Sequence, residues 1–155
     1  MGLTLNNITL EECQTLITAD YDWQIDKFFY PGGEAREDSL YHRTFKSAPI
    51  IVLGHLQPLI MKELITKYEV GDHCWRHRDP KWLDVKQGWQ AYAVWITPLN
   101  DDYEGGELLF NDIVVKQEVG VPIKRGHREP HEITQVTSGT RYSLVSWVFK
   151  QIIAL

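Results

Sequence analysis

The chain is poor in the features that mark several classes of protein. Its 155 residues include two cysteines, Cys13 and Cys74, and no CxxC pair, which excludes a disulfide-stapled scaffold and a cysteine-rich zinc module. No apolar run approaches the roughly 18 to 20 residues that cross a bilayer, and no run of Lys or Arg exceeds two. With a net charge of -5 and a pI near 5.6, the composition argues against nucleic acids and anionic membranes as partners.

The sequence also lacks internal repeats, low-complexity tracts and a composition break that would mark a linker. The first residues, MGLTLNNITL, have neither the basic region nor the cleavage site of a signal peptide. We therefore expect a soluble cytoplasmic protein. Because 43% of the residues are hydrophobic and 12% aromatic, the chain can bury one core, and we expect a single domain over residues 1–155 that is a monomer or weak dimer.

An amphipathic helix is predicted near the N-terminus, over residues 9–20 (TLEECQTLITAD). Thr9 can cap its first turn, and Glu12 stands three residues later, as in a capping box. Leu10 and Cys13 share a face with Leu16 and Ile17 at helical spacing. Cys13 is therefore interpreted as a small core residue and not as a reactive thiol.

The rest of the chain divides into a part expected to be helical, residues 1–63, and a strand-rich part from about 64 to 150. A short helix is expected around residues 55–64, and YPGGEAREDS, residues 30–39, is predicted to be a loop. Beyond residue 64, short segments rich in Val, Ile, Tyr, Trp and Thr are separated by Gly, Pro, Asn or Asp turns. This pattern is typical of a β-sandwich or jelly roll.

The segment DHCWRHRDP concentrates side chains that can bind a metal. His77 and Asp79 are two residues apart, so in an extended strand they leave the same face and can converge on one ion. One more histidine would give two imidazoles and a carboxylate, a facial triad typical of non-haem Fe(II) enzymes. The candidate donors in the segment are Asp72, His73, Cys74, His77 and Asp79.

Two histidines downstream can complete such a triad, His127 and His131. His131 opens the strand-like run HEITQV, and Arg141 begins the next predicted strand after the turn TSG. Arginine suits the recognition of a carboxylate because its planar fork donates two parallel hydrogen bonds. Ser143 lies on the same strand face as Arg141 and can add a hydroxyl, and Trp147 continues that face.

The ordered segments YEVGDHCWRHRD, LNDDYEGGELLF, PHE and TRYSLVSW resemble the Fe(II)/2-oxoglutarate-dependent oxygenase superfamily, and within it the prolyl-4-hydroxylase-like branch, to which the EGGE turn also points. The resemblance implies a mainly β fold, a double-stranded β-helix or jelly roll with N-terminal helices packed on one sheet. It implies iron bound by His77, Asp79 and His131. It implies a 2-oxoglutarate C5 carboxylate bound by Arg141 with the help of Ser143, in a pocket lined by Tyr68.

The activity that this resemblance implies is hydroxylation of a C–H bond, with Fe(II) as the metal, 2-oxoglutarate and O2 as cosubstrates, and succinate and CO2 as products. A prolyl or similar residue in a peptide or protein is the expected substrate, near the loops at 30–39 and 80–88, and ascorbate is a candidate further requirement. Asp79 favours hydroxylation over halogenation, because halogenating relatives replace that carboxylate. The expected pocket or substrate contacts are Trp147, Trp82, Trp95 and Tyr92.

Three alternatives stay open at this point. The same chemistry can act on a free amino acid or small metabolite, or the chain can be a non-catalytic cupin-like metal-binding module. A structural zinc site is the third, since His73 and His77 are four residues apart, as are His127 and His131. That site requires both pairs to lie on helices, which the prolines that follow each segment or interrupt it disfavour.

Overall fold

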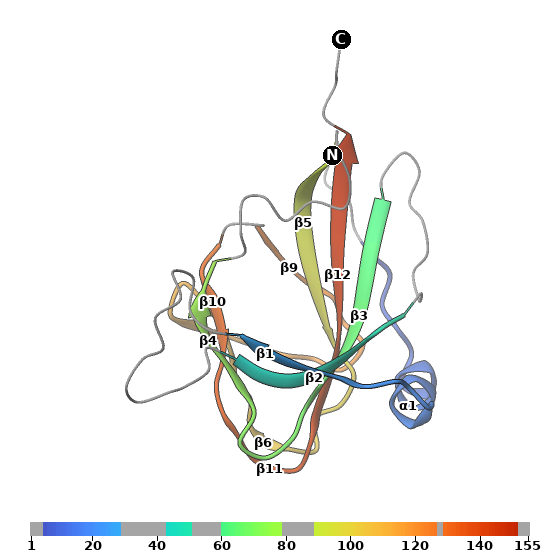
Figure 1. Ribbon diagram of the computed structural model, residues 1–155. Coiled ribbons are helices and arrows are strands. Elements are labelled where there is room, and N and C mark those ends of the chain that lie inside the picture. The colour runs from blue at the N-terminus through green and yellow to red at the C-terminus, as the bar shows by residue number, and fades with distance from the viewer. Residues whose placement is uncertain (1–4, 29–42, 51–59, 79–88, 127–128, 152–155) are drawn as a thin grey trace.

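The computed structural model describes residues 5–28, 43–50, 60–78, 89–126 and 129–151. These residues form mainly antiparallel β-strands with one helix, which confirms the predicted mainly β class (Figure 1). The elements in chain order are α1 (Leu10–Thr18), β1 (Gln24–Phe28), β2 (Arg43–Pro49), β3 (Ile60–Tyr68), β4 (His73–His77), β5 (Trp89–Pro98), β6 (Glu104–Gly105), β7 (Leu108–Phe110), β8 (Ile113–Val115), β9 (Ile123–Gly126), β10 (His131–Ile133), β11 (Val136–Ser138) and β12 (Arg141–Gln151).

Strands distant in sequence are neighbours in the main sheet. Its order is β8-β7-β10-β4-β2-β3-β12-β5-β9, with β1 paired to β2, and β6 pairs with β11 in a second, small sheet. Figure 1 shows β3, β12 and β5 side by side, with β4 and β10 on another side of the molecule. Within this sheet the end of β4 pairs with the start of β10.

The register of β12 against β3 separates two faces of the sheet. Arg141 pairs with Tyr68 and Ser143 with Thr66 on the inner face, while Leu144, the residue after Ser143, faces outward. The inner core consists of Phe45, Tyr68, Cys74, Ile96, Leu108, Ile133 and Val136. The outer core consists of Ile8, Cys13, Ala48, Ile65, Leu99 and Leu144, and so joins the N-terminal segment and α1 to the outer face.

Helix α1 confirms the predicted cap. The Thr9 Oγ1 accepts a hydrogen bond from the Glu12 amide at 3.1 Å, and the Thr9 amide donates to the Glu12 carboxylate at 3.3 Å. Cys13 is 1% exposed, in agreement with a core role, and burial and the nearby Glu12 charge raise the pKa of its thiol. Leu10, expected on the buried face, is 71% exposed. It occupies the first helical position, which extends past the edge of the outer core.

The expectation of a helical part over residues 1–63 is wrong for most of the residues described there. Strands β1 and β2 both precede residue 63, and β3 begins at Ile60, inside the helix expected over 55–64. A short apolar run does not by itself distinguish a buried strand from a helix. Pairing with β2 on one side and β12 on the other decides for the strand. The loop expected at 30–39 lies outside the described residues.

A glycine joins the N-terminal segment to the barrel. The Ile8 amide donates to the Gly120 carbonyl at 2.8 Å, and the Gly120 amide donates to the Pro98 carbonyl at 2.8 Å. Gly120 has a φ of +81°, and a Cβ there would overlap the Ile8 carbonyl oxygen. The close approach of these two backbones therefore requires glycine. Among the described residues, no helix has the length and apolar character needed to span a membrane.

Candidate functional site

The candidate site begins at a β-bulge in β4. Against β10, His77 pairs with His131 and Cys74 pairs with Ile133, so three steps along β4 match two steps along β10. Side chains alternate between faces, so Cys74 and His77 would face opposite ways in a regular strand. The extra residue of the bulge turns both toward the inner face. Local sequence spacing alone does not predict this reversal.

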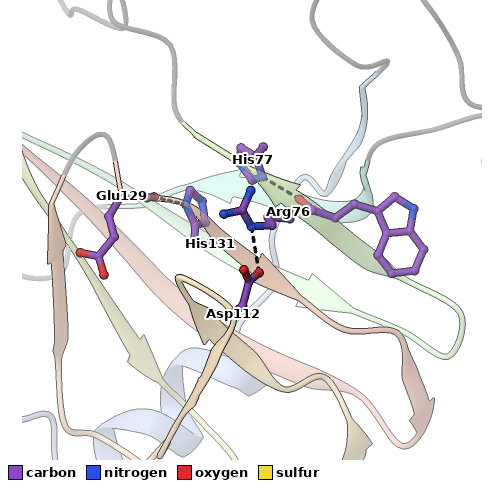
Figure 2. A network of polar contacts seen from close by, with 6 residues as sticks. Arg76, His77, Asp112, Glu129 and His131 are labelled. Carbon is purple, nitrogen blue, oxygen red and sulfur yellow. Dashed lines mark hydrogen bonds and ion pairs between the residues drawn. The ribbon is translucent and has the colours of Figure 1, made fainter.

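The His77 and His131 rings meet where β4 and β10 pair, with centroids 4.2 Å apart and planes at 57° (Figure 2). The Nδ1 of His77 lies 2.8 Å from the Trp75 carbonyl oxygen, and the Nδ1 of His131 lies 3.0 Å from the Glu129 carbonyl oxygen. A carbonyl oxygen only accepts, so these contacts place the proton on both Nδ1 atoms, and in the neutral ring the lone pair is then on Nε2. This second-sphere arrangement orients metal-binding histidines.

An ion pair and a hairpin turn hold the two histidine strands in place. The Arg76 Nε donates to the Asp112 carboxylate at 2.8 Å across the β7–β8 turn, in which Asn111 and Asp112 have positive φ (Figure 2). The Asn111 amide donates to the Pro130 carbonyl at 2.9 Å, one residue before His131. Because the Arg76 and Asp112 side chains are 52% and 66% exposed, the ion pair adds little to the free energy of unfolding, and its main effect is to orient the β7–β8 turn against β4.

The third predicted ligand, Asp79, lies outside the described residues, as does His127. Accordingly, no group of three His, Cys, Asp or Glu side chains arranged for a metal occurs in the described ranges. The two imidazoles fit a metal by the chemistry of their donors, since a backbone carbonyl oxygen faces the Nδ1 of each ring and leaves Nε2 as the nitrogen that would bind the ion. In the sequence, Asp79 stands two positions after His77, the last residue of β4.

Arg141 is buried in the inner core and is 1% exposed. Its Nη2 donates to the Gln117 Oε1 at 2.8 Å and its Nη1 to the Ser143 Oγ at 3.3 Å, while the buried Nε has no hydrogen-bond partner among the described residues. In the described part of the chain no carboxylate forms an ion pair with this guanidinium. A buried cation without an anion is costly, so the site fits an anionic group that binds there.

Aromatic and hydroxyl groups surround the guanidinium. Its Cζ lies 5.3 Å from the centroid of the Tyr68 ring, which in turn stacks on Phe45 at 4.8 Å. The Ser143 and Thr66 hydroxyls are 2.6 Å apart and both side chains are buried. Thr66 can therefore donate to Ser143 and leave the Ser143 proton free for an anion beside Arg141. Arg141, Ser143 and Tyr68 are thus brought together, as the sequence predicted.

Three residues of this region were missed by sequence reasoning. Thr66 stands two residues before Tyr68 and so faces the same way, a signal that strand alternation could have revealed. Gln117 lies between β8 and β9, where no periodic pattern marks it. Gly106, in the predicted EGGE turn, has a φ of +60°, and a Cβ there would lie 2.9 Å from the Arg141 Cδ. The second glycine of that turn therefore makes room for the arginine.

The expected tryptophan and tyrosine contacts have different outcomes. Trp147 lies on the Arg141 face of β12, half-buried, with the Lys62 Nζ 5.9 Å from its ring. Trp95 pairs with Ser146, which puts it on the opposite face of the sheet from Arg141, and the Lys124 Nζ lies 5.3 Å from its ring. Trp82 and the Tyr92 side chain are outside the described residues.

The zinc alternative required His73 and His77 to lie one helical turn apart. Instead they lie at the two ends of an extended strand. His73 stacks on Trp75 at 3.9 Å, and its Nδ1 lies 3.3 Å from the Gly71 carbonyl oxygen. His73 is therefore a packed strand residue. Cys74 is buried, with its Sγ 3.6 Å from the His77 Nδ1.

Comparison with known proteins agrees with this geometry. No family model matches the chain. A PKHD-type hydroxylase of Alteromonas mediterranea is 29% identical over 110 residues, which cover 64% of this chain and 48% of that protein. A PKHD-type hydroxylase of a Caulobacter strain is 29% identical over 128 residues, or 76% of this chain and 56% of its own length. The chain is thus similar in sequence to proteins named PKHD-type hydroxylases.

Solved structures extend the relationship to the fold. A viral collagen prolyl hydroxylase of Paramecium bursaria Chlorella virus-1, solved as a 2OG complex, has a TM-score of 0.65 at 16% identity and covers 94% of this chain and 93% of its own. A Pseudomonas putida prolyl-4-hydroxylase has a TM-score of 0.54 at 17% identity, with coverage of 92% and 98%. These likenesses confirm the jelly-roll fold. The chain spans about half the length of the curated relatives it matches.

Proposed function

We propose that the chain is an Fe(II)- and 2-oxoglutarate-dependent dioxygenase that hydroxylates a C–H bond and releases succinate and CO2. The observation that carries this proposal is Arg141, buried in the inner core with no carboxylate partner among the described residues. A fold does not keep an uncompensated cation inside without a compensating anion from elsewhere. The distal carboxylate of a keto-diacid is an anion of the required chemistry.

The residues of the candidate site form two groups, one that would bind a metal and one that would bind an anion. His77 and His131 would offer their Nε2 lone pairs to Fe(II), with Asp79 as the carboxylate of the triad. Iron bound there would supply the redox chemistry that couples O2 reduction to oxidative decarboxylation of the cosubstrate. The inner-face apolar residues limit water around both groups, which strengthens the electrostatic contact between the guanidinium and a carboxylate.

Arg141, Ser143 and Tyr68 would hold the far end of the cosubstrate. The guanidinium has five N–H donors, of which two have a partner among the described residues, so donors remain for a carboxylate. The Ser143 hydroxyl adds a further donor when Thr66 donates to it. The Tyr68 ring covers one face of the guanidinium and keeps the fork directed along its plane.

A prolyl or similar residue in a peptide or protein is the proposed substrate. Support comes from structural neighbours that are named prolyl hydroxylases and from relatives named PKHD-type hydroxylases. The runner-up is the same reaction on a free amino acid or small metabolite. A non-catalytic cupin-like module fits less well, because such a module needs a metal site and has no use for an uncompensated arginine in the core.

Anaerobic titration tests the proposal. Fe(II) and 2-oxoglutarate, added together without O2, are expected to give a weak visible charge-transfer band that neither gives alone. Admitting O2 is expected to produce succinate, and a His131→Gln variant serves as the matched control. An iron-loaded protein that gives neither signal would favour the binding module.

The substrate class is tested separately by succinate release with proline-containing peptides and with free amino acids. Stimulation by peptides alone supports the peptide assignment. Stimulation by the free compounds alone would replace it with the runner-up.

A further inference from the structure

We infer that Gln117 is a positioning residue for Arg141, and that as a neutral acceptor it leaves the positive charge of the guanidinium available to the cosubstrate carboxylate. The identity of the anion as 2-oxoglutarate rests on the proposed function. The contact between Gln117 and Arg141 does not depend on it. Nothing in the motif pattern of the sequence singles out Gln117.

The contacts of Gln117 define its orientation. Its Oε1 accepts a hydrogen bond from the Arg141 Nη2 at 2.8 Å, and its Nε2 donates to the Gly106 carbonyl oxygen at 3.3 Å. The reversed amide would place two donors against each other at Arg141 and two acceptors against each other at Gly106. Chemistry therefore determines the amide assignment.

These contacts belong to a continuous chain of polar groups. The Gly106 carbonyl holds the Gln117 amide, Gln117 and Ser143 each hold one terminal nitrogen of Arg141, and Thr66 holds Ser143. Two acceptors on two different terminal nitrogens define the plane of the guanidinium. The plane matters because a carboxylate is bound through two parallel N–H donors that lie in it.

The charge of the acceptor matters as much as its position. A glutamate at residue 117 would have the same shape but would form a buried ion pair with Arg141. The pair would satisfy the cation internally, and an incoming carboxylate would then face a neutralised site beside a like charge. Glutamine holds the nitrogen without removing the charge.

Two substitutions at residue 117 distinguish the effect of the hydrogen-bond acceptor from the effect of the charge of the side chain. Gln117→Glu keeps the shape and adds an anion, whereas Gln117→Met keeps the length and removes the acceptor. Gln14→Glu, on the exposed surface of α1, adds the same charge away from the site and is the matched control. Each protein is measured for the dissociation constant of 2-oxoglutarate by calorimetry, with Fe(II) loaded and O2 absent, and for Tm without metal or cosubstrate.

Gln117→Glu is expected to weaken 2-oxoglutarate binding on the order of 10- to 100-fold and to raise the Tm of the unliganded protein by roughly 2 to 6 °C. Gln117→Met is expected to weaken binding by only about 3- to 10-fold without raising the Tm. In turnover, both variants should raise the KM for 2-oxoglutarate and leave kcat at saturation within about twofold. Gln14→Glu should match the wild type in every measurement.

Equal dissociation constants for Gln117→Glu and the wild type would overturn the inference. So would a Gln117→Glu effect no larger than that of Gln117→Met. If the wild-type protein does not bind 2-oxoglutarate, the proposed function fails. In that case the Tm comparison still tests the contact between Gln117 and Arg141. If residue 117 lies beside the buried guanidinium, the unliganded Gln117→Glu protein has a higher Tm than Gln117→Met. Equal Tm values would show that the two side chains are not in contact.

Discussion

Arg141→Met separates a ligand-binding arginine from a structural one. If Arg141 exists to bind a carboxylate, its removal should strongly weaken cosubstrate binding and leave the fold nearly as stable. Truncating one partner of a buried, hydrogen-bonded charge pair costs about 2 to 5 kcal/mol of binding. At about 1.4 kcal/mol for each factor of ten, the dissociation constant of 2-oxoglutarate should rise at least about 30-fold.

The stability side of this prediction follows from the contacts that remain. Methionine loses the hydrogen bonds to Gln117 and Ser143, each worth about 1 to 3 kcal/mol if its partner is left unsatisfied. Ser143 keeps Thr66 at 2.6 Å, and the Gln117 amide keeps Gly106. Removing an uncompensated buried cation offsets the loss, since the effective penalty for such a charge is several kcal/mol. We expect the free energy of unfolding to stay within about 2 kcal/mol of the wild type.

The assay pairs urea unfolding of the unliganded protein with 2-oxoglutarate calorimetry on the iron-loaded, anaerobic protein. Lys67→Met is the control, because it removes one positive charge from the outer face, where Lys67 pairs with Tyr142. The reasoning is refuted if Arg141→Met binds 2-oxoglutarate as the wild type does. It is refuted equally if Arg141→Met loses most of the stability of the fold, because Arg141 would then be a structural residue.

Three further predictions concern the metal, the fold and the thiol. His131→Gln should lower the affinity for Fe(II) by at least about 100-fold in an anaerobic competition titration, and an unchanged affinity would remove His131 from the site. Gly120→Ala should lower the free energy of unfolding by about 2 to 4 kcal/mol because the added Cβ would overlap the Ile8 carbonyl. Gly71→Ala is the control and should cost only about 1 kcal/mol, since Gly71 has a φ of +95° but open space around it. Equal losses for the two variants would contradict the predicted clash at Gly120. Burial raises the pKa of Cys13, so its thiolate forms only above the usual pH and Ellman's reagent at pH 8 should label it only after denaturation, with Cys13→Ser identifying the signal.

Local chemistry made part of the site readable before the fold was known. Arg141 at the start of a strand and Ser143 two residues later share one face, as side-chain alternation along a single strand predicts. Thr9 and Glu12 likewise determine the helix cap within four residues. Such features depend on neighbours in the chain, and they needed no knowledge of which strands pair.

Features that depend on pairing between distant strands were not readable. The bulge in β4 reverses the alternation and turns His77 inward, and its evidence lies in the register against β10. The face on which Trp95 lies is likewise set by its pairing with Ser146 on β12. Gln117 was missed because it lies between strands, where no period predicts a direction, and only the fold brings it to Arg141.

By itself, the sequence determined which chemical groups are present, their order and the cap of α1, because these depend on covalent spacing and short-range backbone preferences. Only the tertiary structure decided that the His77 and His131 imidazoles meet and that Arg141 is buried with no carboxylate beside it among the residues that the structure describes. Both facts require strands from distant parts of the chain to pair in one register. Burial and charge compensation are properties of that packed arrangement, and no single segment carries them.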